Sequence, residues 1–120
     1  MNLRIEAMGE ITHVIPEGRL DFDAAPAFQQ ALERLFTGGG AGPAPTAVVI
    51  DGAALEYVSS AGLRAVLLAA KAAQRSGAAF ALCALQPAVR EVFALSGFGQ
   101  IMPIHPDLDT ALAQLRAPHK

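Results

Sequence analysis

The sequence predicts a single α/β domain over residues 1–120, in which a mixed sheet of about five strands packs against about four helices. Three observations predict this class. The chain has 120 residues, the usual length of one domain. Its beginning alternates between apolar and polar residues, the pattern of a hairpin with one buried face. Further along, β-branched runs alternate with segments of helical period, which is typical of strand–helix repeats with right-handed crossovers.

The chain is predicted to begin with two short strands. Residues 3–8 alternate between apolar and polar side chains, and residues 11–15 form a second apolar segment after a corner at Gly9 and Glu10. We therefore expect an N-terminal β-hairpin. Because an antiparallel hairpin then joins parallel strand–helix units, the sheet should be mixed.

The first helix is predicted over residues 23–36. Phe28 and Leu32 belong to an apolar set that repeats at helical spacing in this segment. Asp23 is the predicted N-cap, and Pro26 is tolerated because it lies in the first turn.

Residues 38–45 are rich in glycine and proline and are predicted to form a flexible surface loop. A phosphate-binding loop is not expected there, because no Gly-Lys-Ser/Thr follows. The next segment, residues 46–50, is a β-branched run that predicts a buried strand ending at Asp51. A strand in this place offers no helix N-terminus to an anion.

The second half of the chain repeats the alternation of helices and strands. The predicted elements are a helix over residues 60–76 closed by Gly77, a strand over 79–84, a helix opened by Pro87 and closed by Gly97, a strand around 101–104, and a helix after Asp107, followed by a tail over 116–120.

Charge and cysteine content exclude several classes. With 9 Lys+Arg against 11 Asp+Glu, the chain lacks the cationic excess of nucleic-acid binders and of proteins that bind anionic membranes. The single cysteine, Cys83, excludes an internal disulfide, and its apolar neighbours indicate a buried thiol. The charged N-terminus does not resemble a signal peptide, and no apolar run is long enough to span a membrane. We expect a cytoplasmic, soluble protein without direct membrane insertion.

Residues 55–64 connect the buried strand to the helix over 60–76, at the end of the sheet where α/β proteins usually bind ligands and partners. Ser59 and Ser60 lie in this connection. One interpretation is that either serine only caps the helix. The other is that one hydroxyl is phosphorylated. The helix dipole would tolerate a phosphate there, so the modification would act on a partner and leave the fold intact.

The helix over residues 60–76 has two distinct faces. Arg64, Leu68, Lys71 and Arg75 fall within a narrow arc, a basic stripe with one exposed leucine. The residues expected to face the sheet are Leu63, Val66, Leu67, Ala70 and Ala73. The stripe is either a solvated face or a docking surface, in which Leu68 is the apolar anchor and the cations attract an acidic partner.

We expect neither a catalytic nor a metal site. His13, His105 and His119 lack the spacing of metal ligands. Asp51 follows a strand, but no nucleophile or base accompanies it, and residues 58–62 do not form a Gly-x-Ser-x-Gly elbow. The protein is therefore predicted to be no enzyme and to bind no cofactor.

The chain resembles a known family, the STAS domains, and in particular the bacterial anti-sigma factor antagonists of the SpoIIAA type. Three ordered motifs carry this resemblance. They are EGRLD at residues 17–21, the strand and turn at 48–63 that ends in YVSSAGL, and QPAVREVFALSGF at 86–98. The motifs extend over nearly the whole chain, so the resemblance implies a single domain with the STAS fold.

The resemblance also implies a phosphorylation site. In these antagonists the turn reads Asp-Ser-Ser/Thr-Gly-Leu, and the serine after the aspartate is phosphorylated. Aligned on Gly62 and Leu63, that serine is Ser60, with Ser59 the less favoured candidate. Ser59 takes the aspartate position, and Ala61 takes that of the second Ser/Thr. The implied partner-binding residues are Asp21, Ser59, Ser60, Ala61, Gly62, Arg64, Leu68, Lys71 and Arg75.

The implied partner is an anti-sigma factor with a histidine-kinase-like serine kinase domain, to which the ATP belongs. By this resemblance the unphosphorylated protein binds that partner, phosphorylation on Ser60 releases it, and a serine phosphatase resets the cycle. The alternative is a STAS subunit of an ABC-type lipid transport complex, or of another signalling assembly, in which Ser60 only caps its helix.

Overall fold

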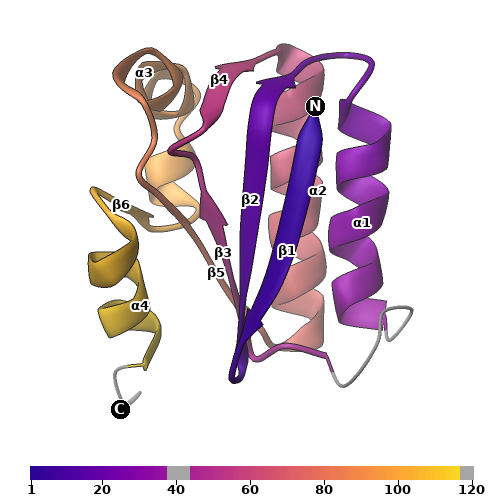
Figure 1. Ribbon diagram of the computed structural model, residues 1–120, viewed down its shortest axis with the longest axis vertical. Coiled ribbons are helices and arrows are strands. Elements are labelled where there is room, and N and C mark those ends of the chain that lie inside the picture. The colour runs from indigo at the N-terminus through magenta and orange to yellow at the C-terminus, as the bar shows by residue number, and fades with distance from the viewer. Residues whose placement is uncertain (38–43, 117–120) are drawn as a thin grey trace.

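The computed structural model describes residues 1–37 and 44–116 and confirms the α/β class (Figure 1). The elements in chain order are β1 (Asn2–Met8), β2 (Ile11–Leu20), α1 (Ala25–Thr37), β3 (Ala47–Asp51), β4 (Leu55–Val58), α2 (Ser60–Ser76), β5 (Ala79–Cys83), α3 (Pro87–Leu95), the 3-10 turn η1 (Phe98–Gln100), β6 (Ile104–His105) and α4 (Leu108–Arg116).

Within the described residues the sheet has six strands. They lie in the order β1-β2-β3-β5-β6, and β4 pairs with the far end of β2. β1 is antiparallel to β2, and the other paired strands run parallel. The structure therefore confirms the N-terminal hairpin, the mixed sheet and the four helices.

Helices cover both faces of the sheet (Figure 1). On one face α1 and α2 pack together over the larger core, which includes Phe28, Leu32 and Val66. On the other face α4 covers a smaller core that includes Cys83 and Leu112. The central strands are thus buried on both sides, as the β-branched run in β3 predicts.

Two strands in the first half of the chain differ from the prediction. β2 has ten residues, because it changes partner along its length: Ile11 to Val14 pair with β3, and Gly18 to Leu20 pair with β4. Pro16 lies between these two stretches, where neither β3 nor β4 pairs with β2. A proline, which has no N–H to donate, is therefore tolerated there. β4 was not predicted as a strand, since its buried residues are at its two ends and do not alternate with exposed ones.

The first helix begins two residues later than predicted. α1 starts at Ala25, and the carboxylate before it that accepts a backbone N–H is that of Asp21, not Asp23. Asp21 Oδ1 accepts the Ala24 N–H at 3.0 Å, and its carbonyl accepts the N–H of Ala25 at 3.0 Å. These bonds form a short turn between β2 and α1, so the helix cannot begin at residue 23.

The predicted C-terminal end of α2 and the predicted start of α4 are confirmed. Gly77 is the C-cap of α2 and adopts the left-handed conformation with φ of 80°. Asp107 precedes α4, and its Oδ1 accepts the Thr110 N–H at 2.7 Å.

The chain after α3 departs from the prediction in detail. α3 ends at Leu95, Gly97 adopts φ of 76°, and η1 occupies the next residues. The last strand therefore starts at Ile104 instead of 101. Arg116, which the prediction assigned to the tail, is the last residue of α4. Residues 38–43 of the predicted loop and 117–120 of the predicted tail lie outside the described residues.

Candidate functional site

The candidate site lies where β2 and β4 end and α2 begins. In Figure 1 this is the upper end of the sheet, where the connections from β2 to α1 and from β4 to α2 meet. The Ser59 N–H donates to the Leu20 carbonyl at 3.0 Å, which joins the end of β2 to the start of α2. The parallel pairing of Leu20 with Val58 aligns these two strand ends.

The two adjacent serines have different environments. Ser59 is half-buried and is the N-cap of α2: its Oγ accepts the Gly62 N–H at 3.1 Å and donates to the Leu20 carbonyl at 3.4 Å. Ser60 is exposed, and its hydroxyl makes no hydrogen bond within the described part of the chain. The hydroxyl of Ser60 is therefore accessible, whereas that of Ser59 serves the fold.

Gly62 holds the first turn of α2 against β2. A Cβ atom at this position would collide with the Leu20 carbonyl oxygen and would lie 2.9 Å from both Leu20 Cγ and Val58 Cγ2. No larger residue fits without a shift of backbone atoms, so this glycine sets the distance between the helix and the strand ends. Gly62 is one of the predicted partner-binding residues, but it is buried. Its role in this structure is to pack α2 against β2 and β4.

Asp21 lies at the site, but one of its two carboxylate oxygens already accepts a hydrogen bond from the backbone. It is half-buried, and one oxygen accepts the Ala24 N–H. The next residue, Phe22, is 77% exposed, a large apolar side chain in water beside the start of α1. Phe22 is not among the predicted contact residues, although an aromatic residue between two aspartates in a connection is a signal that could have identified it.

Arg19 and Tyr57 form a second feature that sequence reasoning missed. They are register partners on β2 and β4, and the Arg19 guanidinium carbon lies 4.1 Å from the centre of the Tyr57 ring. Tyr57 is 39% exposed, so this cation–π pair lies at the surface. The pair could not be predicted, because β4 itself was not predicted.

The outer face of α2 carries the predicted cations. Arg64, Lys71 and Arg75 are exposed, and within the described residues none of them lies in an ion pair. The prediction of an exposed Leu68 was wrong, because this side chain is half-buried. On the helix surface Leu68 lies beside the buried Ala65, and α1 packs along α2.

The remaining α2 residues follow the predicted face in part. Val66 and Ala73 are buried, as expected. Leu63, Leu67 and Ala70 are half-buried and pack against the main core. Ala61, one of the predicted contact residues, is also half-buried. The fully buried face consists mainly of alanines, namely Ala65, Ala69, Ala72 and Ala73.

The other candidate side chains serve the sheet. His13 Nε2 and Asp51 Oδ2 lie 2.8 Å apart and are largely buried, and Asp51 Oδ1 also accepts the Ala53 N–H at 3.0 Å. Burial, together with the carboxylates of Asp51 and Asp107, raises the pKa of the Cys83 thiol from 9.0 to about 12. Cys83 is therefore a poor nucleophile, as the buried-thiol interpretation predicts.

Among the described residues no three His, Cys, Asp or Glu side chains come together in a way that would hold a metal ion. No helix in the same residues is long and apolar enough to cross a membrane.

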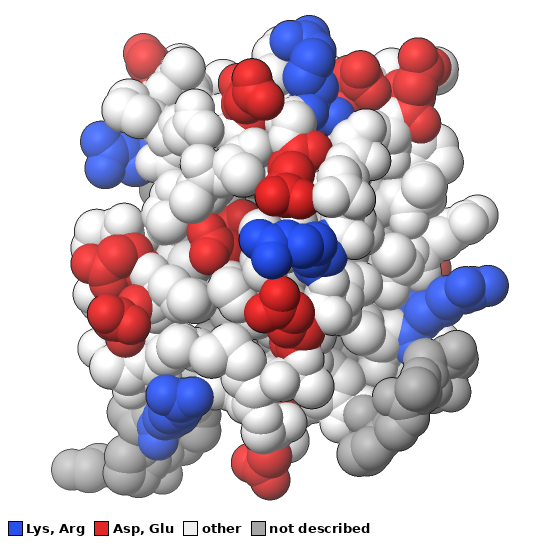
Figure 2. Space-filling model, viewed as in Figure 1, with Lys and Arg blue, Asp and Glu red and all other residues white. Residues whose placement is uncertain are grey.

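The face of β1 and β2 carries charges of both signs. Figure 2 shows acidic and basic side chains interspersed on this side of the molecule. Arg4 forms two ion pairs at the surface. Its Nη1 lies 3.4 Å from Glu6 Oε2, and its Nε lies 3.6 Å from Glu17 Oε1. Such mixed charges do not produce the single-sign field that attracts nucleic acid.

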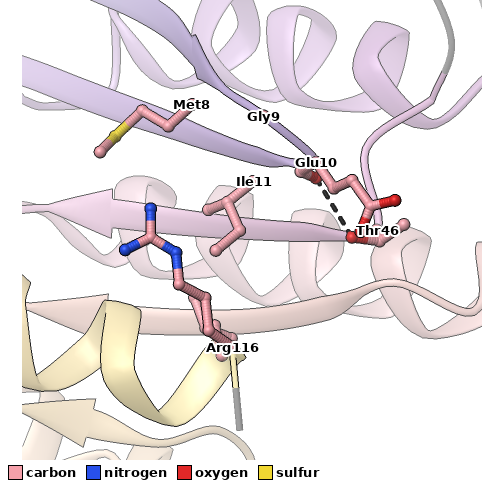
Figure 3. A pocket seen from close by; sticks show the side chains of 7 residues that line it. Met8, Gly9, Glu10, Ile11, Thr46 and Arg116 are labelled. Carbon is pink, nitrogen blue, oxygen red and sulfur yellow. Dashed lines mark hydrogen bonds between the residues drawn. The ribbon is translucent and has the colours of Figure 1, made fainter. Parts of the chain in front are cut away.

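A hollow of about 490 Å³ lies between the β1–β2 turn and α4 (Figure 3). Met8 and Ile11 contribute apolar atoms to it, and Arg116 reaches toward it from the end of α4. The Glu10 carbonyl accepts both the N–H and the hydroxyl of Thr46, at 3.0 and 3.2 Å. This hollow is at the opposite end of the sheet from Ser60 and is not part of the candidate site.

Comparison with protein families identifies the class of this protein. The STAS domain model matches residues 2–111, so the chain belongs to the STAS domain family. In this member of the family, the described residues form a six-stranded mixed sheet, and Ser60 is the first residue of α2.

Similar proteins include several anti-sigma factor antagonists. The chain is 46% identical over 69 residues to a Bordetella bronchiseptica protein, BtrV, whose name places it among these antagonists; the match spans 58% of this chain and 60% of that relative. A crystal structure of an anti-sigma factor antagonist from Mycobacterium paratuberculosis has a TM-score of 0.84 and 28% identity, and the match covers 97% of this chain and 94% of the other. Phosphorylated SpoIIAA from Bacillus has a TM-score of 0.73 and 22% identity, with coverage of 96% and 100%.

Proposed function

We propose that this STAS protein is an anti-sigma factor antagonist, and that phosphorylation of Ser60 ends its binding to an anti-sigma factor. The observation that carries the proposal is the contrast between the two serines: the hydroxyl of Ser59 is used by the helix cap, and that of Ser60 is exposed. The named antagonists among its relatives support the general role.

The position of Ser60 suits a phosphate. Ser60 is the first residue of α2, whose first amides have no carbonyl partner within the helix. A phosphate carries about −1.5 to −2 charges at neutral pH, and the positive end of the helix dipole stabilises them. Phosphorylation should therefore leave the fold intact and change the surface that a partner meets.

The chemistry assigned to this chain is that of an acceptor. The Ser60 oxygen attacks the γ-phosphorus of an ATP held by the partner, the bond to ADP breaks, and the hydroxyl proton passes to a base of the partner. The chain then needs no cofactor and no catalytic group of its own. A serine phosphatase would hydrolyse the phosphoserine and restore the hydroxyl.

The proposed contact surface extends from the β2–α1 connection along α2. Phe22 offers an exposed aromatic anchor at one end. Arg64, Lys71 and Arg75 offer exposed cations along the helix, which would attract an acidic face of the anti-sigma factor. Asp21 contributes by shaping the connection through its bond to Ala24.

A capture experiment with matched baits tests the proposal. Wild-type protein, Ser60→Asp and Ser60→Ala are each immobilised in a lysate of the source organism, and bound proteins are identified by mass spectrometry. We expect wild type and Ser60→Ala to retain an anti-sigma factor with a serine kinase domain, and Ser60→Asp to lose it at least about ten-fold. Incubation of the captured kinase and ATP with each protein should phosphorylate wild type at Ser60 and leave Ser60→Ala unmodified.

The opposite outcomes are equally specific. Equal recovery of a transporter ATPase or permease by all three baits would show that this protein is a fixed subunit of a transport complex, and that Ser60 only begins a helix. Phosphate on Ser59 instead of Ser60 would contradict the assignment of the acceptor.

A further inference from the structure

A second hollow, of about 450 Å³, lies beside the C-terminal half of α2. Leu67 borders it from the helix, Phe80 from the start of β5, and Ile101 and Met102 from the segment after η1. Segments that are distant in the sequence thus form its walls, so it is a product of the tertiary structure.

The hollow has an apolar floor and a partly polar rim. Phe80 and Met102 are only 8% and 4% exposed, whereas Ile101 is 55% exposed at the edge. On the helix side the rim carries the exposed Lys71 and Gln74. An apolar centre with a polar rim is the usual anatomy of a protein–protein contact.

The charge of α2 indicates what kind of partner fits. The helix Ser60–Ser76 contains Arg64, Lys71 and Arg75 and no acidic residue, although the whole chain has a net charge of −2. None of these cations is paired with a carboxylate in the part of the chain that the structure describes. An occupant that brings carboxylates would neutralise them, and one that brings more cations would be repelled.

We propose that this hollow binds an acidic amphipathic helix of a partner protein. One apolar side chain of that helix inserts between Leu67 and Ile101, and an Asp or Glu one turn away contacts Lys71. Nucleic acid fits less well, because it has no apolar side chain to fill the buried floor formed by Phe80 and Met102.

This binding goes beyond the proposed function because it does not require the Ser60 switch, although Lys71 belongs to both proposed surfaces. Leu67 and Gln74 are separated from Ser60 by roughly 10 and 20 Å along the helix, at 1.5 Å per residue. The Debye length at physiological ionic strength is about 8 Å, so a phosphate on Ser60 is largely screened at the hollow. Peptide binding here should therefore be insensitive to the charge at residue 60.

A matched pair of peptides tests the proposal. Both are amphipathic helices of about 18 residues with the same leucine positions, and they differ only in having Glu or Lys on the polar face. Each is titrated into the isotope-labelled full chain and followed by two-dimensional NMR. We expect the Glu peptide to shift the amides of Leu67, Lys71 and Ile101, and to bind about ten-fold more tightly than the Lys peptide.

Variants locate the binding and separate it from the Ser60 site. Ile101→Asp should abolish binding of the Glu peptide, and Lys71→Glu should weaken it and strengthen binding of the Lys peptide. Leu95→Asp is the matched control, because Leu95 is an apolar residue on α3 that is 82% exposed and not part of the hollow. Ser60→Asp should leave the peptide affinity within about two-fold of wild type.

Several results would overturn the proposal. These are equal affinity for both peptides, shifts that map outside the hollow, no saturable binding of the Glu peptide below about 1 mM, or loss of binding in Ser60→Asp. Since the peptides are not the anti-sigma factor, a negative result here leaves the capture experiment unaffected, and a failed capture experiment leaves this one unaffected.

Discussion

Ser59 and Ser60 show how one backbone position decides the use of a hydroxyl. Ser59 has extended backbone angles, φ of −90° and ψ of 174°, so its side chain turns back to the Gly62 N–H. Ser60 is one residue further along, inside the helix, and its hydroxyl has no such acceptor role. In the antagonists that this chain resembles, an aspartate occupies the position of Ser59, and a carboxylate could make the same bond.

Two substitutions of Ser59 should distinguish the stabilising effect of its side-chain cap from that of a negative charge at the N-terminus of α2. Ser59→Ala removes the acceptor for the Gly62 N–H and should lower the free energy of unfolding by about 1 kcal/mol. Ser59→Asp loses the donor to the Leu20 carbonyl but keeps an acceptor and adds a negative charge at the helix N-terminus, so it should lose less stability than Ser59→Ala. Urea unfolding of both variants measures this, and an equal loss in both would contradict the assignment of the cap.

The second prediction at the residue scale concerns Gly62. Gly62→Ala places a methyl group against the Leu20 carbonyl and 2.9 Å from Val58 Cγ2, so it should destabilise the protein by about 1–3 kcal/mol. Gly99→Ala is the control, because a Cβ atom there meets nothing within 4 Å. Thermal unfolding of the two variants compares them, and a stable Gly62→Ala protein would show that the strand ends can move.

At the scale of elements, a buried polar pair joins two parallel strands. His13 on β2 and Asp51 on β3 meet at 2.8 Å, and the second carboxylate oxygen of Asp51 accepts the Ala53 N–H where the chain leaves β3. The pair thus ties β2 to the turn that leads into β4 and on to the candidate site. It was not predicted, because nothing in the sequence shows that these two positions are neighbours.

A double-mutant cycle measures this link. Asp51→Ala leaves the largely buried His13 without its partner, which should cost about 1–3 kcal/mol of unfolding free energy. His13→Ala should also be destabilising, and the double variant should lose less than the sum of the two single losses. Strictly additive losses in urea unfolding would show that the two side chains do not interact.

At the scale of the whole molecule, the sheet separates two cores of unequal size. The larger one lies under α1 and α2, and the smaller one, under α4, contains Cys83. The raised pKa of Cys83 couples this smaller core to pH, because the unfolded chain releases the thiol proton near 9.0 and the folded protein holds it until about 12. Above pH 9.0 the unfolded state therefore binds fewer protons, and stability falls as the pH rises toward 12.

The corresponding prediction compares wild type with Cys83→Ala. The full contribution of the thiol is present below pH 9.0, and between pH 9.0 and about 12 the unfolding free energy of wild type should decrease more steeply than that of the variant. Chemical unfolding at a series of pH values gives the two slopes. Parallel slopes would show that the thiol titrates normally in the folded protein.

Much of the fold could be predicted because it depends on local pattern. Helix α2 was predicted from its apolar period and its C-terminal Gly77, and β3 from its β-branched run. β4 could not be predicted, because its four residues are held by pairing with the far end of β2 and not by an alternating pattern. The prediction that Leu68 is exposed was wrong for a similar reason, because the burial of this side chain depends on what packs beside α2.

By itself the sequence determined the α/β class, most element positions, the turn that holds Ser59 and Ser60, and the three cations of α2, because these follow from periodicity, capping preference and residue type. The tertiary structure alone decided which serine is the cap, that Asp21 shapes the connection before α1, and that a hollow forms between Leu67 and Ile101. The hollow depends on contacts between residues that are far apart in the chain, and local pattern carries no information on such contacts. The two hydrogen bonds are local, but residue type alone could not choose between neighbouring candidates, Ser59 or Ser60 for the cap and Asp21 or Asp23 for the turn.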